Sequence, residues 1–286
     1  MPPNFSPSFI FRSLEFLRVF AEACLPMNPP YPAAPKKTGF YRFLGLSLHP
    51  VDVEEVHSFI AEVVKKGEQA LVLNLNIHCV NLASAQPWLR SFLNEAQLVF
   101  CDGDGVRWGL RLLGLNPPPK ITYDRWIWQL AEFADRRGLR LYFLGARPGV
   151  AEEAALKLKS RFPSLQVVGC HHGYFDREGP ENEKVIEKIN LLTPDILIMG
   201  LGMPVQEKWL CENWKWVRAH VFLTGGAVFD YASGGARRAP PWMIRCHLEW
   251  FYRFLQEPRR LFARYFLGIP YFFLRVFLEG LKKEKR

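Results

Sequence analysis

Short apolar runs alternate with segments of helical periodicity along residues 51–224, and this alternation limits the folds open to the chain more than any other feature. Some runs have the continuous hydrophobicity of strands buried on both faces, namely residues 70–75, 98–100, 140–144, 165–169, 195–199 and 220–224. The segments between them are expected to be helices, namely a helix after the turn at Asp102 and residues 51–66, 79–94, 124–137, 150–161, 182–192 and 205–216. Strands separated by helices of this length predict an α/β domain with a doubly wound, mostly parallel sheet.

The length and composition suit one large folded domain with appendages. The chain has 286 residues, of which 49% are apolar, so it can bury a full core and a disordered protein is excluded. Its six cysteines are scattered without a CxxC pair. They predict reduced thiols of a cytosolic protein, not a disulfide framework or a zinc site.

The first part of the chain has an amphipathic pattern followed by prolines. Charged residues recur every three or four positions in residues 9–25, and five prolines follow up to residue 35. Charges within the apolar run argue against a secretory signal, and the run is shorter than the ~20 apolar residues that span a bilayer. The expected helix fits a membrane surface or the protein's own body. We therefore expect three parts, namely a helix and linker (residues 1–37), the α/β domain (residues 38–236) and an appendage (residues 237–286).

The appendage carries most of the net charge of +9. It holds twelve Lys and Arg residues against four Glu, shows no strand pattern and is rich in aromatic residues, so we expect helices. Pro270 is expected to separate its last part, where the apolar run at residues 271–281 is too short, and too interrupted by Arg275 and Glu279, to span a bilayer. Aromatic bulk beside a basic end favours a helix at the surface of an anionic membrane. The alternative is a packing helix with a solvated basic end. No nucleic-acid partner is expected, because the aromatic residues are interleaved with aliphatic ones.

The sequence QLVFCDGDGVRW, residues 97–108, predicts a strand, a turn and a helix. Asp102 follows the apolar run, so it is expected at the carboxyl end of a strand, where the ligand crevice of open α/β sheets lies. A carboxylate there can act as a general base or bind a sugar or a metal. The alternative is that Asp102 only caps the helix that follows.

A second glycine-rich turn, GLGMPVQE at residues 200–207, also follows a strand and opens a helix. Val205 occupies the place of the third glycine of a dinucleotide fingerprint, so nicotinamide binding is poorly supported. Gly200 and Gly202 provide flexible backbone before a helix N-terminus that can receive phosphate oxygens or sugar hydroxyls. We expect Gln206 and Glu207 to point from the first helical turn towards the crevice. Glycines at residues 145–149 and 225–226 place further turns at the same edge of the sheet.

Several longer motifs together resemble the WecG/TagA/CpsF family of bacterial glycosyltransferases, also called glycosyltransferase family 26. The motifs are DGDGV (102–106), FLG (143–145), HHGYF (171–175), PDILIMGLGMPVQEKW (194–209), GGAVFD (225–230), RRAPPWM (237–243) and LEWFYRFLQEPRR (248–260). The resemblance implies a Rossmann-like body and an appendage that brings arginines to the membrane surface. It implies transfer, with inversion and without a required metal or other cofactor, of an N-acetylmannosamine-type or related sugar from a UDP donor to a polyprenyl-diphosphate-linked sugar. Such an enzyme would make bacterial surface polysaccharide or a teichoic acid-type polymer, in the cytoplasm and peripherally on the inner face of the cell membrane. The resemblance does not determine the oligomeric state, so a homo-oligomer is one of the states left open.

The resemblance also suggests roles for individual residues. Asp102 matches the proposed base, Asn76 the asparagine of a T-x-N strand end, and Gln206 the glutamine of a PxQE motif. Asn74 stands where the family commonly has threonine, and Lys120 where it has a basic residue, often arginine, before a glycine-containing loop. These two differences leave the donor sugar open. The candidate catalytic residues are Asp102 and Gln206, and the candidate substrate-binding residues are Asn74, Asn76, Lys120, Gly200, Gly202, Glu207, Arg253 and Arg260.

These residue types suit an inverting sugar transfer. The reaction needs one base for the acceptor hydroxyl, for which Asp102 is the candidate, and positive charge for the departing diphosphate. Lys120, Arg253 and Arg260 are candidates for that charge, since guanidinium and ammonium groups bind phosphate. The alternative for the arginines of the appendage is a solvated helix face, paired in part with Glu249 and Glu257.

Three other interpretations compete with this one. Asp102-Gly103-Asp104 is formally the DxD of metal-dependent sugar-nucleotide transferases. A nicotinamide oxidoreductase would need the missing third glycine. A membrane-bound sugar-nucleotide sensor or scaffold would bind a donor without turnover, so it is separated from an enzyme by the effect of changing Asp102.

Overall fold

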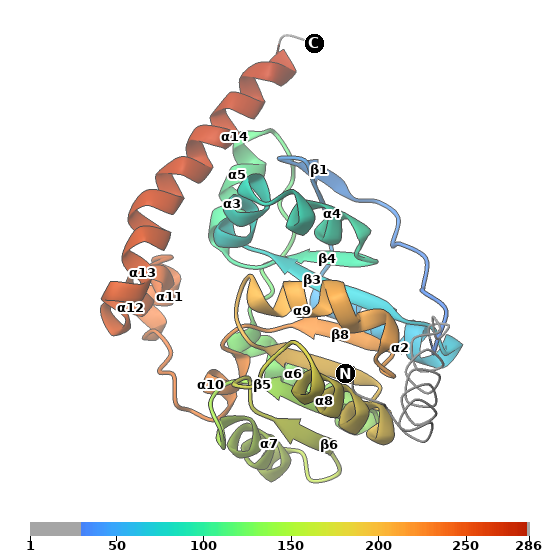
Figure 1. Ribbon diagram of the computed structural model, residues 1–286. Helices are drawn as coiled ribbons and strands as arrows, with labels where there is room; N and C mark the ends of the chain where they lie inside the picture. The colour runs from blue at the N-terminus through green and yellow to red at the C-terminus, as the bar shows by residue number, and fades with distance from the viewer. Residues whose placement is uncertain (1–29, 285–286) are drawn as a thin grey trace, which may run out of the picture.

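Six parallel strands form the central sheet in the computed structural model, which describes residues 30–284 (Figure 1). The strands are β3 (Ala70–Leu75), β4 (Leu98–Cys101), β5 (Arg140–Gly145), β6 (Gln166–His171), β7 (Ile196–Gly200) and β8 (Val221–Thr224). Their order across the sheet is β4-β3-β8-β7-β5-β6, and every neighbouring pair is parallel. The predicted α/β fold with a parallel sheet is therefore confirmed, and all carboxyl ends meet at one edge.

Helices cover both faces of the sheet. One face packs against α3 (Ile77–Ala85), α4 (Pro87–Glu95), α5 (Asp104–Leu112), α8 (Pro180–Leu192) and α9 (Val205–Asn213), which a 3-10 turn (Trp214–Trp216) follows. The other face packs against α2 (Val53–Lys66), α6 (Tyr123–Arg137), α7 (Val150–Arg161) and α10 (Val228–Ala232). The prediction of one helix at residues 79–94 was wrong. The chain forms α3 and α4 instead, because Pro87 occupies the first turn of a new helix, where its missing N–H and fixed φ are tolerated.

The segment before the sheet was not predicted in detail. It forms an antiparallel hairpin of β1 (Tyr41–Phe43) and β2 (Leu46–Leu48). Ahead of it, the N–H groups of Ala34 and Lys37 donate to the carbonyls of Gln69 and Gln97. Gln69 directly precedes β3, and Gln97 directly precedes β4. Residues 30–37 therefore run along the amino edge of the sheet, opposite the carboxyl edge. The predicted amphipathic helix at residues 9–25 lies outside the described residues.

The C-terminal part is helical, as predicted, and consists of α11 (Pro241–Arg245), α12 (Glu249–Gln256), α13 (Pro258–Phe262), η2 (Ala263–Leu267, a π-helical stretch) and α14 (Gly268–Glu284). The side-chain Nδ2 of Asn81 on α3 donates to the carbonyl of Gly268 at 2.7 Å. The ring of Phe272 is fully buried beside Phe43 and Gly109. These contacts dock α14 on α3, α5 and β1.

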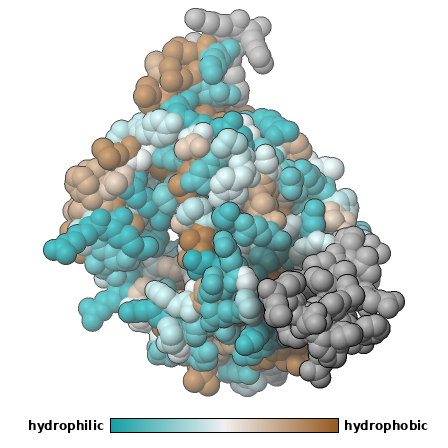
Figure 2. Space-filling view, in the orientation of Figure 1, coloured by the Kyte–Doolittle hydropathy of each residue, from teal (hydrophilic) through white to brown (hydrophobic). Residues whose placement is uncertain are grey.

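The expected break at Pro270 was wrong. Pro270 lies inside the continuous helix that α13, η2 and α14 form, at the point where the π-helical stretch passes into α14, and the missing N–H of proline is tolerated at this irregular part of the helix. The continuous helix Pro258–Lys282 is 25 residues long and contains an 18-residue window with a mean hydropathy of 1.4, so by length and composition alone it could cross a membrane. The prediction of a run too short to span a bilayer concerned residues 271–281, and the helix extends beyond that run. Figure 2 shows apolar side chains on the end of α14 that projects beyond the body at the top of the view.

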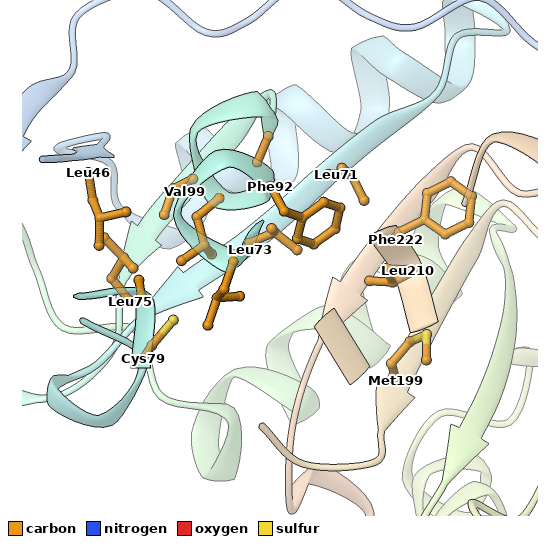
Figure 3. Close-up of a cluster of buried hydrophobic side chains, with 14 of the residues drawn as sticks. Leu46, Leu71, Leu73, Leu75, Cys79, Phe92, Val99, Met199, Leu210 and Phe222 are labelled. Atoms are coloured by element: carbon orange, nitrogen blue, oxygen red, sulfur yellow. The ribbon is translucent and has the colours of Figure 1, made fainter. Parts of the chain in front are cut away.

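Alternate residues of β3, β4, β5, β7 and β8 enter opposite cores, as expected of a sheet with helices on both faces. Leu71, Leu73 and Leu75 of β3 point to the α3, α4 and α9 side, where Figure 3 shows them with Phe92 and Leu210. The intervening residues of β3 face α2 and α6 on the other side. Full burial of each such side chain contributes about 1.5–3 kcal/mol, so the two cores together hold the strand ends in fixed register.

Candidate active site

A cavity of about 820 Å³ lies at the carboxyl edge of the sheet, between the body and the C-terminal helices. The ends of β3, β4 and β8, the turn after β7 and the start of α3 contribute one wall, and α12, α13, η2 and α14 contribute the other. Six of the predicted site residues line it, namely Asn74, Asn76, Asp102, Gly202, Arg253 and Arg260. Four others lie outside its lining, namely Lys120, Gly200, Gln206 and Glu207.

Asp102 follows β4 directly, and its carboxylate is held by two carboxamides. Nδ2 of Asn74 donates to Oδ2 of Asp102 at 2.9 Å, and Nδ2 of Asn76 donates to the same oxygen at 3.2 Å. Asp102 is partly buried and lines the cavity. Because both of these hydrogen bonds reach Oδ2, the arrangement leaves Oδ1 as the oxygen that can accept a proton.

The two carboxamides are themselves oriented by the fold. The hydroxyl of the buried Thr224, at the end of β8, donates to Oδ1 of Asn74 at 3.1 Å. Oδ1 of Asn76 caps α3 by accepting the N–H of Cys79 at 3.0 Å. Each amide therefore has its oxygen engaged elsewhere and must present its NH₂ group to Asp102. Asp102 does not cap α5, whose N-cap is Gly103.

The electrostatics of Asp102 are set by opposing effects. Burial raises its pKa, and the hydrogen bonds from Asn76 and Asn74 together with the charges of Arg253 and Arg264 act in the opposite direction. A carboxylate with a raised pKa is a stronger base than an exposed aspartate. This is the shift that a general base acting near neutral pH requires.

Three arginines from the C-terminal helices enter the cavity. Arg253 on α12 lies with its guanidinium 5.6 Å from the ring centroid of Tyr231. Arg260 on α13 is exposed and pairs with Glu257, its Nη2 donating to Oε1 at 2.7 Å. Arg264 also lines the cavity, and its buried Nε has no hydrogen-bond partner among the described residues. A cluster of guanidinium groups with unused donors suits the oxygens of a phosphate or diphosphate.

The second glycine turn is arranged differently from the expectation. Gln206 and Glu207 are buried and do not open to the cavity. Oε1 of Gln206 accepts a hydrogen bond from the N–H of Gly226 at 3.1 Å, so Gln206 holds the turn after β8 in place. A side chain at Gly200 would meet the ring of Phe229 within 2.6 Å, so that glycine serves close packing. Gly202, at φ +79°, does line the cavity.

Asp104, the second carboxylate of the formal DxD, is engaged by cationic groups. Nη1 of Arg107 donates to its Oδ1 at 3.0 Å, and Nζ of Lys120 donates to its Oδ2 at 2.9 Å. Burial would raise its pKa, but hydrogen bonds from Lys120 and His247 outweigh burial and hold the pKa at about 2. Within the described residues, no three His, Cys, Asp or Glu side chains are grouped to hold a metal ion. Asp104 therefore belongs to an ion-pair cluster.

A model of the glycosyl transferase family WecG/TagA/CpsF matches residues 41–286, from β1 through the C-terminal helices. The chain belongs to the WecG/TagA/CpsF family of glycosyl transferases. The resemblance inferred from the motifs is thereby confirmed. Since the matched range includes α11–α14, the arginines that enter the cavity lie within the part of the chain that the WecG/TagA/CpsF model describes.

Three curated relatives of this WecG/TagA/CpsF protein carry the name N-acetylglucosaminyldiphosphoundecaprenol N-acetyl-beta-D-mannosaminyltransferase. The protein from Bacillus spizizenii is 30% identical over 236 residues, which cover 81% of this chain and 88% of that protein. The protein from Bacillus subtilis is 31% identical over 193 residues, covering 67% and 73%. The protein from Staphylococcus aureus is 26% identical over 234 residues, covering 82% and 87%.

Sequence reasoning missed three residues of the site. Thr224 was expected only as a strand end, yet its hydroxyl orients Asn74. Burial together with the charges of Arg264 and Arg260 lowers the pKa of His78 to about 4, so this cavity-lining ring is neutral near pH 7 and can hydrogen bond a sugar. Arg264 could have been predicted as a site residue, because it stands one helical turn after Arg260 and so lies on the same helix face.

Proposed function

We propose that this chain is an inverting, UDP-sugar-dependent glycosyltransferase. It transfers an N-acetylmannosamine-type or related sugar to a polyprenyl-diphosphate-linked N-acetylglucosamine, in the synthesis of a bacterial surface glycopolymer of the teichoic acid type. The names of the relatives support the sugar and the acceptor. Family membership supports the reaction class.

The observation that carries the proposal is the contrast between Asp102 and the other carboxylates that line the cavity. Asp102 is bonded to neutral carboxamides. The remaining carboxylates are ion-paired, Asp104 with Lys120 and Arg107, Glu249 with Lys120, and Asp124 with Arg238. A carboxylate paired with lysine or arginine is a poor base, because taking up a proton would cost it the attraction of its cationic partner. Asp102 is therefore the carboxylate suited to take a proton.

The proposed step is a single displacement. As the acceptor hydroxyl oxygen attacks the anomeric carbon, its proton passes to Oδ1 of Asp102. The bond from that carbon to the β-phosphate oxygen breaks, and the electron pair leaves with UDP, so the anomeric configuration inverts. Arg253, Arg260 and Arg264 stabilise the negative charge that grows on the diphosphate. Catalysis by a single carboxylate needs no covalent intermediate with the protein.

The outer surface of the C-terminal helices supports a membrane location. Large apolar side chains that do not line the cavity are exposed along α12–α14, namely Phe251, Leu255, Phe262, Leu267, Tyr271, Leu274, Phe277, Leu278 and Leu281. An exposed apolar surface of this extent beside basic residues suits the interface of an anionic membrane. We propose a peripheral position on the inner face of the cell membrane, with the cavity facing the lipid-linked acceptor.

A direct test uses the purified protein, a panel of UDP-sugars and a short-chain lipid diphosphate N-acetylglucosamine. Mass spectrometry should detect a product that contains one added sugar, and NMR should show an anomeric configuration opposite to that of the donor. Asp102→Asn keeps the size and hydrogen bonding of the side chain but removes its basicity, so turnover should fall by ~100-fold or more while UDP affinity is nearly unchanged. Near-normal turnover in Asp102→Asn would exclude the base role.

The same measurements address the alternative of a sensor or scaffold. A sensor would bind UDP-sugars by calorimetry but form no product with any acceptor. Activity that is unchanged by a chelator would further separate the proposed enzyme from a DxD transferase, which needs its divalent ion.

A further inference from the structure

Lys120 joins the body to the C-terminal helices. Its Nζ donates to Oδ2 of Asp104, the first residue of α5, at 2.9 Å, and to Oε2 of Glu249, the first residue of α12, at 2.6 Å. The three side chains are between 13% and 25% exposed. Asp104 and Glu249 line the cavity, whereas Lys120 lies outside its lining. The lysine therefore stands behind two carboxylates that separate it from any ligand in the cavity.

His247 adds a second bond across the same junction. Nδ1 of His247 lies 3.0 Å from Oδ2 of Asp104, and its ring packs edge-on against Trp108 of α5. The backbone of His247 is left-handed, at φ +57°, in the turn between α11 and α12. Glycine is favoured at such a position. A histidine there, with its ring on Asp104, indicates that the side chain contributes to the junction.

The junction determines which face of α12 meets the body. Glu249 and Arg253 lie one turn apart on α12 and so share one face of the helix. When Lys120 holds Glu249, that face turns inward and Arg253 enters the cavity over the ring of Tyr231. Arg107 completes the cluster, because its Nε donates to the carbonyl of Pro118 and holds the loop that leads to Lys120.

We infer that Lys120, Asp104, Glu249 and His247 form an ionic latch that fixes α12 on the body and places Arg253 in the cavity that Asp102 faces. Lys120 is then a positioning residue that acts through Arg253, not a ligand of the diphosphate. The inference rests on the proposed function for the role of Arg253. The latch itself is a statement about how α12 is held, so it can be tested apart from turnover.

The test compares Lys120→Met, Glu249→Gln and the double variant. Lys120→Met removes the ion-pair partner of the partly buried Glu249, and Glu249→Gln removes one of the two partners of Lys120, so in both single variants the link between α12 and the body is broken and α12 should loosen. For a latch, both single variants should lower kcat on a soluble acceptor by ~10-fold or more, and the double variant should be no worse than the poorer single one. Lys120→Arg should retain most of the activity, because it keeps the charge.

A direct role of Lys120 on the diphosphate predicts a different pattern. Glu249→Gln would then release the lysine towards the ligand, so UDP affinity would hold or improve, while Lys120→Met alone would weaken it. That pattern, or losses in the two single variants that multiply in the double variant, would overturn the latch. Lys66→Met is the matched control, because Lys66 pairs with Glu62 at 2.6 Å on α2, away from the cavity. It should leave kcat and UDP affinity unchanged.

Hydrogen exchange separates failure of the latch from failure of the proposed function. The backbone amides of α12 (Glu249–Gln256) should exchange ~10-fold faster or more in Lys120→Met and Glu249→Gln than in the wild type or Lys66→Met. This readout needs no substrate, so it stands even if no acceptor is turned over. Unchanged exchange of α12 in both variants, with thermal unfolding showing them folded, would disprove the latch.

Discussion

Nε2 of Gln206 donates a 2.8 Å hydrogen bond to Oε1 of Glu207, and both side chains are buried beneath the turn at Gly225 and Gly226. The other carboxyl oxygen of Glu207, Oε2, has no hydrogen-bond partner among the described residues. Burial raises the pKa of Glu207 to about 7. This buried acid accepts a hydrogen bond from the glutamine that holds one wall of the cavity. Its burial lowers the stability of the folded chain by an amount that depends on pH.

Glu207→Gln should therefore stabilise the chain at pH 8 but not at pH 5. In the unfolded chain the pKa of this carboxyl is 4.5, below its value in the folded chain. Between about pH 4.5 and 7 the folded state binds more protons, so the free energy of unfolding falls as pH rises through that window. The neutral amide avoids this loss, which is on the order of 1–3 kcal/mol above pH 7. Urea unfolding at the two pH values measures the difference.

Glu212→Gln is the matched control, since Glu212 is exposed on the same helix and pairs with Lys208. It should shift stability little and equally at both pH values. If Glu207→Gln changes stability by the same amount at pH 5 and pH 8, the buried carboxyl does not titrate as described.

The hydroxyl of Thr224 should matter for turnover through Asn74. Thr224→Val keeps the shape but removes the donor to Oδ1 of Asn74, so the amide can turn and present its oxygen to Asp102. We expect kcat on a soluble acceptor to fall by ~10-fold, with a loss of about 1–3 kcal/mol in stability from the unpaired buried oxygen. Thr224→Ser keeps the hydroxyl and should retain most turnover. Equal kcat values in the valine and serine variants would remove Thr224 from the orientation of Asp102.

The sequence could predict the place of Asp102, because it follows an apolar run and parallel strands bring their carboxyl ends together. Asn74 and Asn76 were identified only by the resemblance. Which way a side chain in a first helical turn points is set by tertiary packing. The pattern of residues 200–207 predicted Gln206 and Glu207 at the crevice, but the turn at Gly226 covers them, and the N–H of Gly226 donates to Oε1 of Gln206.

The C-terminal helices show the same limit. Their helical character was readable from composition, and Arg253 and Arg260 were identified by resemblance. The ion pair of Lys120 with Glu249 could not be predicted from the sequence, because the two residues are distant along the chain and meet only when α12 docks on the body. The continuation of the helix through Pro270 was also missed, since proline usually marks a break, but here it follows the π-helical stretch Ala263–Leu267 within one continuous helix.

Gly109 should be intolerant of a side chain because α14 docks on it. A Cβ atom there would lie 2.9 Å from ring atoms of both Phe272 and Phe43, in a buried and tightly packed contact. Gly109→Ala should cost about 1–3 kcal/mol of stability and lower turnover, because displacement of α14 disturbs the cavity wall. Gly280→Ala on α14 is the control, since its nearest contact is an ordinary 3.7 Å to Leu113. Urea unfolding and turnover of the two variants should differ clearly. Equal behaviour would show that the contact of Phe272 with Gly109 does not hold α14.

Two truncations should separate catalysis from membrane binding, and the structure determines where to cut. Deletion from Pro270 would remove the buried Phe272 and Val276 and the cavity-lining Phe273, so it would damage the site itself. Deletion of residues 278–286 keeps these side chains and removes the apolar and basic end. It should leave turnover on a soluble acceptor within ~2-fold of the wild type, while binding to anionic vesicles weakens and loses its dependence on salt.

Deletion of residues 237–286 should instead abolish turnover on the soluble acceptor, because it removes Arg253, Arg260 and Arg264 from the cavity. Binding to neutral vesicles is the comparison for the shorter deletion, since the basic end should contribute little there and its apolar side chains should contribute alone. A shorter deletion that binds anionic vesicles as well as the wild type would place the membrane contact elsewhere. If that deletion also lost turnover on the soluble acceptor while thermal unfolding stayed normal, residues 278–286 would act in the reaction and not as an anchor.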